Sequence, residues 1–334
     1  MENNDVNHSQ VATIIVNYNT GAMVCRALDS LAKERTYLVN LSVVVVDNQS
    51  PNDSFSQIKQ HIEKQSYGAW AEIILAEKNG GYAYGNNLGF SYYKNKYKDK
   101  PSPIEYYWLL NPDTYLRPKA CLNLVNFLST TDGAICGSRL EDPDGTPQIS
   151  TFNFPNTVSE ILSGFSLGVL DKLFARYRVT RALTDTRETV DWVAGASLMI
   201  HQSVFKRVGL MDDKYFLYFE EVDYCLQVQR AGFKCWYVPE SRIVHEVGAA
   251  TGISDVRKRQ PRRPTYWFDS RRRYFLKNHG FITLILADFG WTIGYIFWCL
   301  RKRLTSPKDL DNQPPKYLQD FVRNSIFNVA RLKK

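Results

Sequence analysis

The segment Val11-Ala-Thr-Ile-Ile-Val16 is a run of mostly β-branched apolar residues, and it ends in the polar turn Asn17-Tyr-Asn-Thr20. Continuous apolar runs of this length are typical of strands that are buried on both faces of a parallel sheet. Residues 22–34 follow with apolar side chains at helical spacing. The fold is therefore predicted to start with a strand, an asparagine-containing turn and a helix.

The same pattern recurs further along the chain. Apolar strands are predicted at 41–46, 71–75 and 106–110, with helical stretches between them. This βαβ series predicts an α/β fold with a doubly wound sheet, whose ligand crevice lies at the carboxyl ends of the strands. An aspartate after a strand is usually a turn residue. A binding site is favoured here because polar clusters end three of these strands, at 17–20, 47–50 and 111–113.

Length and composition exclude several classes of protein. The chain has 334 residues, of which 44% are hydrophobic and 23% charged, so it is neither disordered nor collagen-like. The length suits one large domain with an appendage, or two domains. The first ten residues lack the apolar segment of a secretory signal, and the six cysteines show neither C-x-x-C spacing nor a disulfide-dense pattern. A cytoplasmic protein is therefore expected.

The net charge of +8 is unevenly divided along the chain. Residues 1–256 contain 24 Lys and Arg against 29 Asp and Glu, whereas residues 257–334 contain 18 against 5. The basic C-terminal region predicts contact with an anionic partner, either a membrane surface or a nucleic acid. The predicted organisation is a disordered N-terminus at 1–10, a main domain at 11–256 and a basic region at 257–334.

Two motifs near the predicted crevice point to phosphate and metal chemistry. Asn79-Gly-Gly-Tyr-Ala-Tyr-Gly-Asn-Asn87 is a glycine-rich turn that opens a helix, where backbone N–H groups can approach a phosphate. By itself, this motif fits a structural turn equally well. Asn111-Pro-Asp113 places a carboxylate on a stiff turn at a strand end, where it could hold a divalent cation or simply form a type I turn.

Two further motifs carry titratable groups. Phe219-Glu-Glu-Val-Asp223 begins a helix with three acids, and apolar aromatic residues precede it. Acids in a first turn often serve only the helix dipole, but a carboxylate beside aromatic rings is a candidate general base with a raised pKa. His245 follows a predicted strand at 234–238, and a neutral imidazole beside Asp113 would suit Mn²⁺ or Mg²⁺.

Taken in order, these motifs resemble those of the inverting family 2 glycosyltransferases, which have a GT-A fold, and most closely the bacterial rhamnosyltransferase branch that acts on lipid-linked glycans. The resemblance covers about residues 11–250, and the last eighty or so residues match only loosely. It is carried by Ile15-Val-Asn-Tyr-Asn19, Val46-Asp-Asn-Gln-Ser50, Asn79 to Asn87, Leu110-Asn-Pro-Asp-Thr114, Gly195-Ala196, Phe219 to Leu226 and Val244-His245.

The resemblance implies a role for each of these positions. Glu221 would be the catalytic base, with Glu220 just before it, and Asp113 and His245 would hold the divalent cation. The nucleotide-sugar donor would be bound by residues of the strand-end turns and the glycine-rich motif, namely Asn17, Asn19, Asp47, Asn48, Asn79, Gly80, Gly81, Asn86, Asn87 and Asn111. The implied fold is GT-A, a Rossmann-like, doubly wound mixed sheet, followed by a C-terminal helical extension that associates with membranes.

Three positions depart from the family pattern. Asn111 replaces a carboxylate at the first position of the D-x-D motif, which reduces the charge of the metal site. Glu221 stands where Asp is common, so its carboxylate reaches further by one methylene. Gln227-Val-Gln-Arg230-Ala231 lacks the tryptophan of the processive enzymes' Q-x-x-R-W motif, which argues for the addition of one sugar and against polymerisation.

The resemblance predicts a metal-dependent transfer of one sugar to a lipid-linked glycan in cell-surface polysaccharide biosynthesis. The first choice of donor is dTDP-rhamnose, which supplies L-rhamnose, and the alternative is a UDP-linked hexose. Two readings of other classes stay open. Residues 257–277, with nine Lys and Arg among aromatic residues, could bind nucleic acid, although no nucleic-acid partner is expected. Asn111 could mark an inactive glycan-binding relative.

The C-terminal region contains twenty mostly apolar residues at 281–300, just long enough to span a bilayer. Asp288 lies near the middle, and a charged residue at the centre of a membrane helix costs about 2.5–3.5 kcal/mol. Basic and aromatic flanks favour a helix that lies in the interface of an anionic membrane, ahead of a spanning helix and of an ordinary buried helix. The expected location is the cytoplasmic face of the cell membrane, and the sequence leaves the oligomeric state open.

Overall fold

The computed structural model describes residues 9–99, 103–246, 261–306 and 313–325. The chain forms two compact units. The first unit comprises residues up to 152 together with 182–216 and 220–250, and the second comprises 153–181, 217–219 and the residues from 251 onwards.

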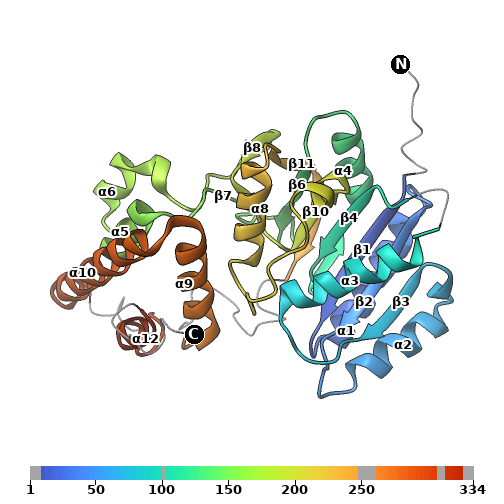
Figure 1. The fold of residues 1–334 in the computed structure, drawn as a ribbon, viewed down its shortest axis with the longest axis horizontal. Coiled ribbons are helices and arrows are strands. Elements are labelled where there is room, and N and C mark those ends of the chain that lie inside the picture. Colours follow the sequence, from blue (N-terminus) through green and yellow to red (C-terminus); the bar gives the residue numbers. More distant parts are fainter. Residues whose placement is uncertain (1–8, 100–102, 247–260, 307–312, 326–334) are drawn as a thin grey trace. The chain divides into compact units, whose positions relative to one another are not determined.

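Strand β1 (Val11–Asn17) lies in the middle of the first unit's sheet, and all of its side chains are buried (Figure 1). It pairs in parallel with β2 (Leu41–Asp47) on one side and with β4 (Tyr106–Leu110) on the other. In the β1–β2 register Asn17 lies opposite Asp47. The three strands therefore end at one edge of the sheet, as predicted.

The sheet is mixed and contains nine strands, in the order β3-β2-β1-β4-β10-β6-β11-β5, with β8 added to β11. β3, β2, β1 and β4 run parallel, whereas β10 is antiparallel to both of its neighbours. The remaining strands are β3 (Ala71–Leu75), β5 (Thr114–Leu116), β6 (Ile135–Glu141), β8 (Glu188–Val190), β10 (Ser197–His201) and β11 (Cys235–His245). β7 (Thr151–Phe152) and β9 (Trp192–Val193) form a separate pair. The predicted doubly wound mixed sheet is confirmed.

Helices cover both faces of the parallel half of this sheet. Apolar residues of α1 (Gly21–Glu34), α2 (Ser54–Lys64) and α4 (Ala120–Ser129) join one core cluster with alternate residues of β1 and β2. α3 (Tyr82–Lys96) packs against the other residues of β1. A Cβ atom at Gly89 of α3 would lie 2.5 Å from Ile14, so glycine permits this close approach. Two further helices follow in the chain, α7 (Ser203–Arg207) and α8 (Glu220–Arg230).

The second unit is built from helices. α5 (Thr157–Phe165) packs closely on the long helix α10 (Phe281–Thr305), because Gly164 faces the backbone of Trp291 and Gly290 faces Ile161. α9 (Thr265–His279) and α12 (Tyr317–Asn324) complete an aromatic core, in which the rings of Trp291 and Phe321 stack with centroids 3.8 Å apart. α6 (Gly168–Leu173) follows α5 in the chain.

A buried charge cluster lies inside this helical unit. Arg271 of α9 donates to Asp288 of α10 at 2.6 Å and to Glu160 of α5 at 2.8 and 2.9 Å. The Asp288 side chain is fully buried, and that of Arg271 is 4% exposed. The acid in the middle of the apolar helix is therefore neutralised by an arginine of the same unit.

The structure adds detail to the predicted organisation. The C-terminal region from 257 forms most of the second unit, but residues 153–181 and 217–219 also belong to it. Residues 153–181 show no clear periodicity in the sequence, because their short helices are separated by turns. The N-terminal segment at 1–10 lies largely outside the described residues. In the described part of the chain, α10 is the one helix long and apolar enough to cross a membrane by length and composition.

Candidate active site

The asparagine and aspartate that end β1 and β2 form a closed hydrogen-bond network. The side-chain amide of Asn17 donates to Asp47 at 2.5 Å, and its Oδ1 atom accepts from both the backbone N–H and the hydroxyl of Thr20. Asp47 also accepts from the backbone and the hydroxyl of Ser50, at 2.7 and 2.9 Å. Both side chains are fully buried. The two residues therefore shape the strand-end turns, and Ser50, which was not predicted as a site residue, links them.

The turns that these residues hold carry the next predicted positions. Asn19 is exposed and left-handed, with φ 62°, and its backbone N–H donates to Ser50. Asn48 is buried and donates to the carbonyl of Gly81 at 2.9 Å, whereas its Oδ1 atom has no partner. A buried amide oxygen without a partner is costly, so it is a candidate ligand contact.

The glycine-rich motif is held by contacts on both sides. Gly81 is left-handed, with φ 89°, and a Cβ atom there would lie 1.8 Å from the carbonyl oxygen of Phe216. Asn79 accepts from the N–H of Gly81, and Gly80 precedes it in the same turn. No side chain other than hydrogen fits position 81, because both the backbone conformation and the space exclude one.

The two asparagines inside α3 have different surroundings. Asn87 donates to the carbonyl of Met211 at 2.8 Å and accepts from its N–H at 3.1 Å, so it fastens the loop at Met211 to α3. Asn86 donates to the carbonyl of Tyr82, and its Oδ1 atom is buried without a partner. Asn86 thus resembles Asn48 as a candidate ligand contact, whereas Asn87 has a structural role.

Asp113 and His245 meet at the end of the parallel strands. Asp113 lies in the turn between β4 and β5, His245 is the last residue of β11, and Asp113 Oδ1 lies 3.5 Å from His245 Nε2. Thr114 pairs with His245 in the β5–β11 register, and the N–H of Glu246 donates to the carbonyl of Asp113. Asn111, two residues before Asp113, donates its own N–H to Ala196 at 3.0 Å.

The atoms of this pair fit a cation. Asp113 Oδ1 and His245 Nδ1 are both buried without a hydrogen-bond partner, which is unusual for such groups. A carboxylate oxygen with an imidazole nitrogen is a ligand set that suits Mn²⁺ or Mg²⁺. No cluster of three or more His, Cys, Asp or Glu side chains occurs among the described residues, so a cation here would need further ligands from a substrate or water.

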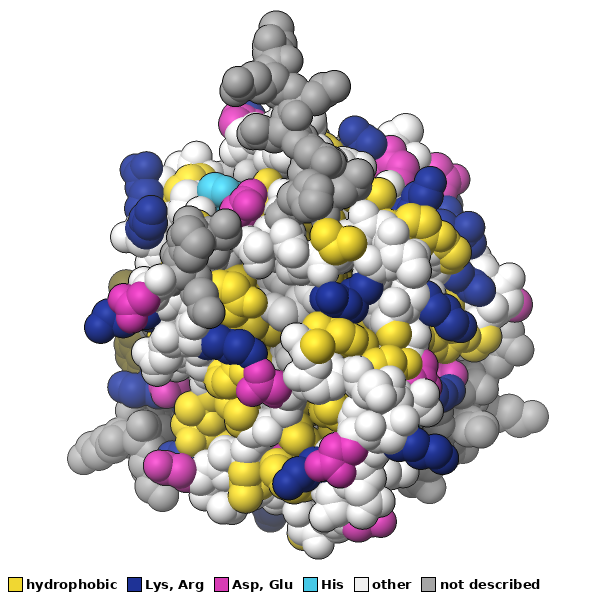
Figure 2. All heavy atoms as spheres, turned by 90° about the vertical axis from the view of Figure 1, so that its right-hand side faces the viewer, with side chains coloured by type: hydrophobic (Ala, Val, Ile, Leu, Met, Phe, Trp, Pro, Cys, Tyr) yellow, Lys and Arg dark blue, Asp and Glu magenta, His cyan; other side chains and the backbone are white. Residues whose placement is uncertain are grey.

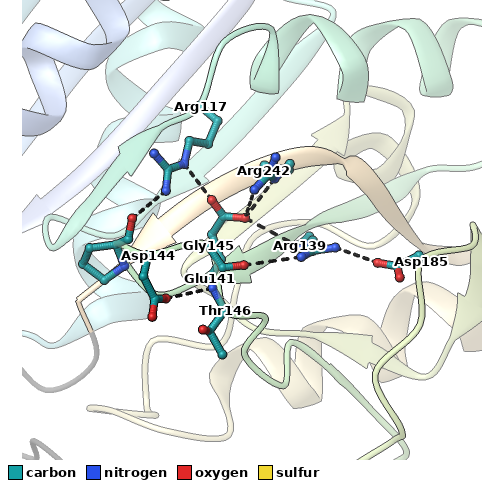
Figure 3. A network of polar contacts seen from close by, with 9 residues as sticks. Arg117, Arg139, Glu141, Asp144, Gly145, Thr146, Asp185 and Arg242 are labelled. Carbon is teal, nitrogen blue, oxygen red and sulfur yellow. Dashed lines mark hydrogen bonds and ion pairs between the residues drawn. The ribbon is translucent and has the colours of Figure 1, made fainter.

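A network around Glu141 fixes the strands that carry this pair (Figure 3). The Glu141 side chain, at the end of β6, is fully buried and accepts from Arg117 at 2.6 Å and from Arg242 at 2.8 Å. Arg117 follows β5 and Arg242 lies in β11. Local sequence patterns do not predict this network, because its residues are spread over 117–242 with no spacing signal.

Glu220 and Glu221 begin α8, and the pKa of each is raised above that of an ordinary glutamate. Burial, and then the neighbouring carboxylate of Glu221, raise the pKa of Glu220 well above its usual value. Burial also raises the pKa of Glu221. One carboxylate oxygen of each residue is buried without a partner. Two adjacent carboxyls in a dry site are an arrangement that enzymes use for general base catalysis.

Tyr82 connects the proposed acids with the glycine-rich motif. Its hydroxyl donates to the carbonyl of Gly195 at 2.7 Å. Its pKa is raised by burial first, then by the negative charges of Glu221, Glu220 and Asp113. The three carboxyls predicted from separate motifs therefore lie within electrostatic range of one phenol. Tyr82 lies within the glycine-rich motif, but the sequence alone does not indicate that it is a site residue.

The chain is similar to known glycosyltransferases. The family model "Glycosyl transferase family 2" matches residues 12–205. The chain is 26% identical over 333 residues to an N-acetylglucosaminyl-diphospho-decaprenol L-rhamnosyltransferase of Mycobacterium tuberculosis, with 96% of this chain and 95% of that protein covered. It is also 26% identical over 240 residues to the rhamnosyltransferase WbbL of Escherichia coli K12, with 70% and 83% covered.

A solved structure with the same fold is the mannosyltransferase PcManGT from Pyrobaculum calidifontis, in complex with GDP-Man and Mn²⁺. Its TM-score is 0.59 at 12% identity, and the alignment covers 96% of this chain and 87% of that one. This likeness confirms the GT-A fold, and the relatives confirm the predicted rhamnosyltransferase branch. The chain therefore belongs to glycosyl transferase family 2 and is a nucleotide-sugar glycosyltransferase.

Proposed function

We propose that the protein transfers one L-rhamnose from dTDP-rhamnose to a lipid-linked glycan, with inversion at the anomeric carbon. The names of the two rhamnosyltransferase relatives support rhamnose as the transferred sugar, and the name of the decaprenol enzyme supports a lipid-linked acceptor. A UDP-hexose is the alternative donor. Single addition is supported by Ala231, which stands where the processive enzymes have the tryptophan of Q-x-x-R-W.

Glu221 is the proposed base. Its carboxylate would remove the proton of the acceptor hydroxyl while that oxygen attacks the anomeric carbon from the side opposite the leaving nucleoside diphosphate. A raised pKa makes Glu221 a stronger base than an ordinary glutamate, and it follows from the burial of the side chain. Glu220 is proposed to lie beside the base, where a negative charge on one carboxyl disfavours ionisation of the other.

Asp113 and His245 are the residues that would hold a divalent cation. When bound, the cation neutralises charge on the leaving diphosphate. Two observations support this assignment, namely the 3.5 Å separation of the side chains and their unpartnered buried atoms. Substrate oxygens and water would complete the ligand set, and Asn111 would face the donor without adding charge.

Asn48 and Asn86 are the proposed contacts of the donor, because each has a buried amide oxygen without a partner. Asn17 and Asp47 would support the nucleotide indirectly, since all of their polar atoms bond to the protein. Asn19, Asn79, Gly80 and Gly81 are proposed to line the same pocket through the backbone. Asn87 is proposed to hold the pocket wall in place through Met211.

The observation that carries the proposal is the approach of Asp113 Oδ1 to His245 Nε2 at 3.5 Å, where each residue has a buried atom without a hydrogen-bond partner. It is tested by incubating the protein with a panel of dTDP- and UDP-sugars, a polyprenyl-diphosphate-linked glycan and either Mn²⁺ or Mg²⁺. Mass spectrometry should detect the acceptor plus one deoxyhexose with dTDP-rhamnose. If no sugar donor in the panel gives transfer in the presence of either cation, the proposal is wrong. Tighter binding to RNA than to any nucleotide sugar would instead favour the nucleic-acid reading.

A further inference from the structure

The two faces of α10 differ sharply in chemistry. Asp288, Trp291 and Tyr295 are buried against the rest of the helical unit. The opposite face exposes large apolar side chains, and Ile282 is 74% and Ile293 58% exposed. The exposed stripe repeats every three or four residues along most of the helix, through Ile282, Leu286, Phe289, Ile293, Ile296 and Leu300. Soluble proteins rarely expose an apolar stripe of this length without a partner.

The buried face prevents the helix from crossing a bilayer alone. Asp288 pairs with Arg271 at 2.6 Å, and Gly290 allows α5 to pack against the helix, so α10 cannot leave its neighbours without unpairing a buried charge. The neighbours are too short to cross with it. α5 has 9 residues and α9 has 15, which is about 14 and 22 Å of helix against a hydrocarbon core of about 30 Å.

Charge complementarity favours an anionic bilayer as the occupant of the stripe. The C-terminal region from 257 contains 18 Lys and Arg against 5 Asp and Glu. Arg301, Lys302 and Arg303 follow the stripe directly on the same helix, and Arg303 is exposed. By contrast, the face on the β3 side of the first unit mixes basic and acidic side chains (Figure 2). A basic end beside an apolar stripe is typical of helices that lie in the plane of a membrane interface.

We infer that α10 lies flat on an anionic membrane surface, with the stripe from Ile282 to Leu300 immersed among the lipids and the Asp288 face directed towards the protein. The described part of the helical unit is thus a monotopic docking element, in which α10 does not span the bilayer. This inference rests on the proposed function only for its purpose, since docking would bring the active site to a lipid-linked acceptor. The binding itself needs neither donor nor acceptor.

The test is sedimentation of the full-length protein with vesicles of phosphatidylcholine, with and without phosphatidylglycerol. The wild type should bind the vesicles with phosphatidylglycerol at least ten times more tightly, and high salt or alkaline carbonate should release it. The double substitution Leu286→Glu and Ile293→Glu should weaken this binding at least tenfold. A matched control is Leu75→Glu, which changes an equally exposed leucine at 59% exposure on β3 and should leave binding unchanged.

Three results would overturn the inference. The first is that the double variant binds vesicles as tightly as the wild type. The second is that alkaline carbonate fails to release the wild type, as for a membrane-spanning protein. The third is that the wild type forms a stable dimer, which the double substitution dissociates.

Transfer to a short-chain, water-soluble acceptor separates this inference from the proposed function. The double variant should retain that activity with an unchanged melting temperature. If the wild type binds vesicles but transfers nothing to either acceptor, the proposed function is wrong while the docking surface stands.

Discussion

Asp113 Oδ1 and His245 Nε2 lie 3.5 Å apart, although 131 positions separate the two residues in the sequence. The register of β5 and β11 produces this meeting, because β5 begins one residue after Asp113 and its first residue lies opposite His245. The buried Glu141 then stabilises this arrangement, because its carboxylate accepts hydrogen bonds from Arg117 and Arg242. A sheet contact thus brings together the two residues that are proposed to hold the cation.

Substituting Asp113 with Asn should abolish tight binding of Mn²⁺ and lower kcat/KM by about 100-fold or more, because a bound cation supplies several kcal/mol of charge stabilisation. Paramagnetic resonance of free Mn²⁺ measures the binding without turnover. Asp132→Asn is the control, since that exposed carboxylate pairs with the surface Lys234. Equal Mn²⁺ affinity in the Asp113 variant and the wild type would contradict the proposal that Asp113 holds the cation.

Substituting Glu221 with Gln should lower kcat by about 10²–10⁴-fold while the dissociation constant of the donor stays within about twofold, because the amide cannot accept a proton. The pH profile of the wild type gives a second readout. Burial raises the pKa of Glu221, so kcat/KM should fall on the acidic side at a pH above that of an ordinary glutamate. Glu77→Gln, at an exposed position, is the control. An acidic limb at the ordinary glutamate pKa would contradict this role.

Glu220 should destabilise the fold at neutral pH. Its pKa in the folded state is raised well above its pKa in the unfolded state. At pH values between these two pKa values, the native state therefore binds more protons than the unfolded state. Stability then falls as the pH rises from the unfolded pKa through the folded pKa. Glu220→Gln should therefore raise the melting temperature, and the gain should be larger at pH 7.5 than at pH 4.5. Equal gains at both pH values would show that protonation is not the cause.

The Arg271 cluster should be essential for the helical unit. Arg271→Ala leaves the carboxylates of Glu160 and Asp288 without their partner, and breaking a buried pair in this way costs about 3–5 kcal/mol. Denaturant unfolding measures the loss. The exposed pair of Lys234 and Asp132 provides the control, since Lys234→Ala should cost about 1 kcal/mol or less. Similar losses in the two variants would contradict the burial argument.

Local sequence patterns predicted the parallel half of the sheet well. The strands at 41–47, 71–75 and 106–110 agree with the expected runs to within one residue, because strands buried on both faces require continuous apolar residues. The pattern also identified the edge at which the polar clusters meet. In these strands the continuous apolar sequence and the burial on both faces of the sheet have the same cause.

Interactions between distant segments could not be predicted in this way. Leu217–Phe219 belong to the helical unit although both flanking segments belong to the first, and Ser270 donates to the carbonyl of Leu217 at 3.0 Å. Tyr218 and Phe219 are left-handed, with φ 69° and 67°, a conformation that bulky residues adopt only under tertiary constraint. No propensity scale favours such a backbone. Local sequence patterns do not predict the ion pair of Arg271 and Asp288 either.

The anomeric configuration of the product tests the central claim, a one-step displacement assisted by Glu221, most directly. The wild-type protein would be supplied with dTDP-β-L-rhamnose and the lipid-linked acceptor, and the one-bond C1–H1 coupling of the new linkage would be measured by NMR. A single α-linked rhamnose, with none formed by the Glu221→Gln variant, is the predicted result. A β-linked product, or transfer by that variant at the wild-type rate, would contradict the account.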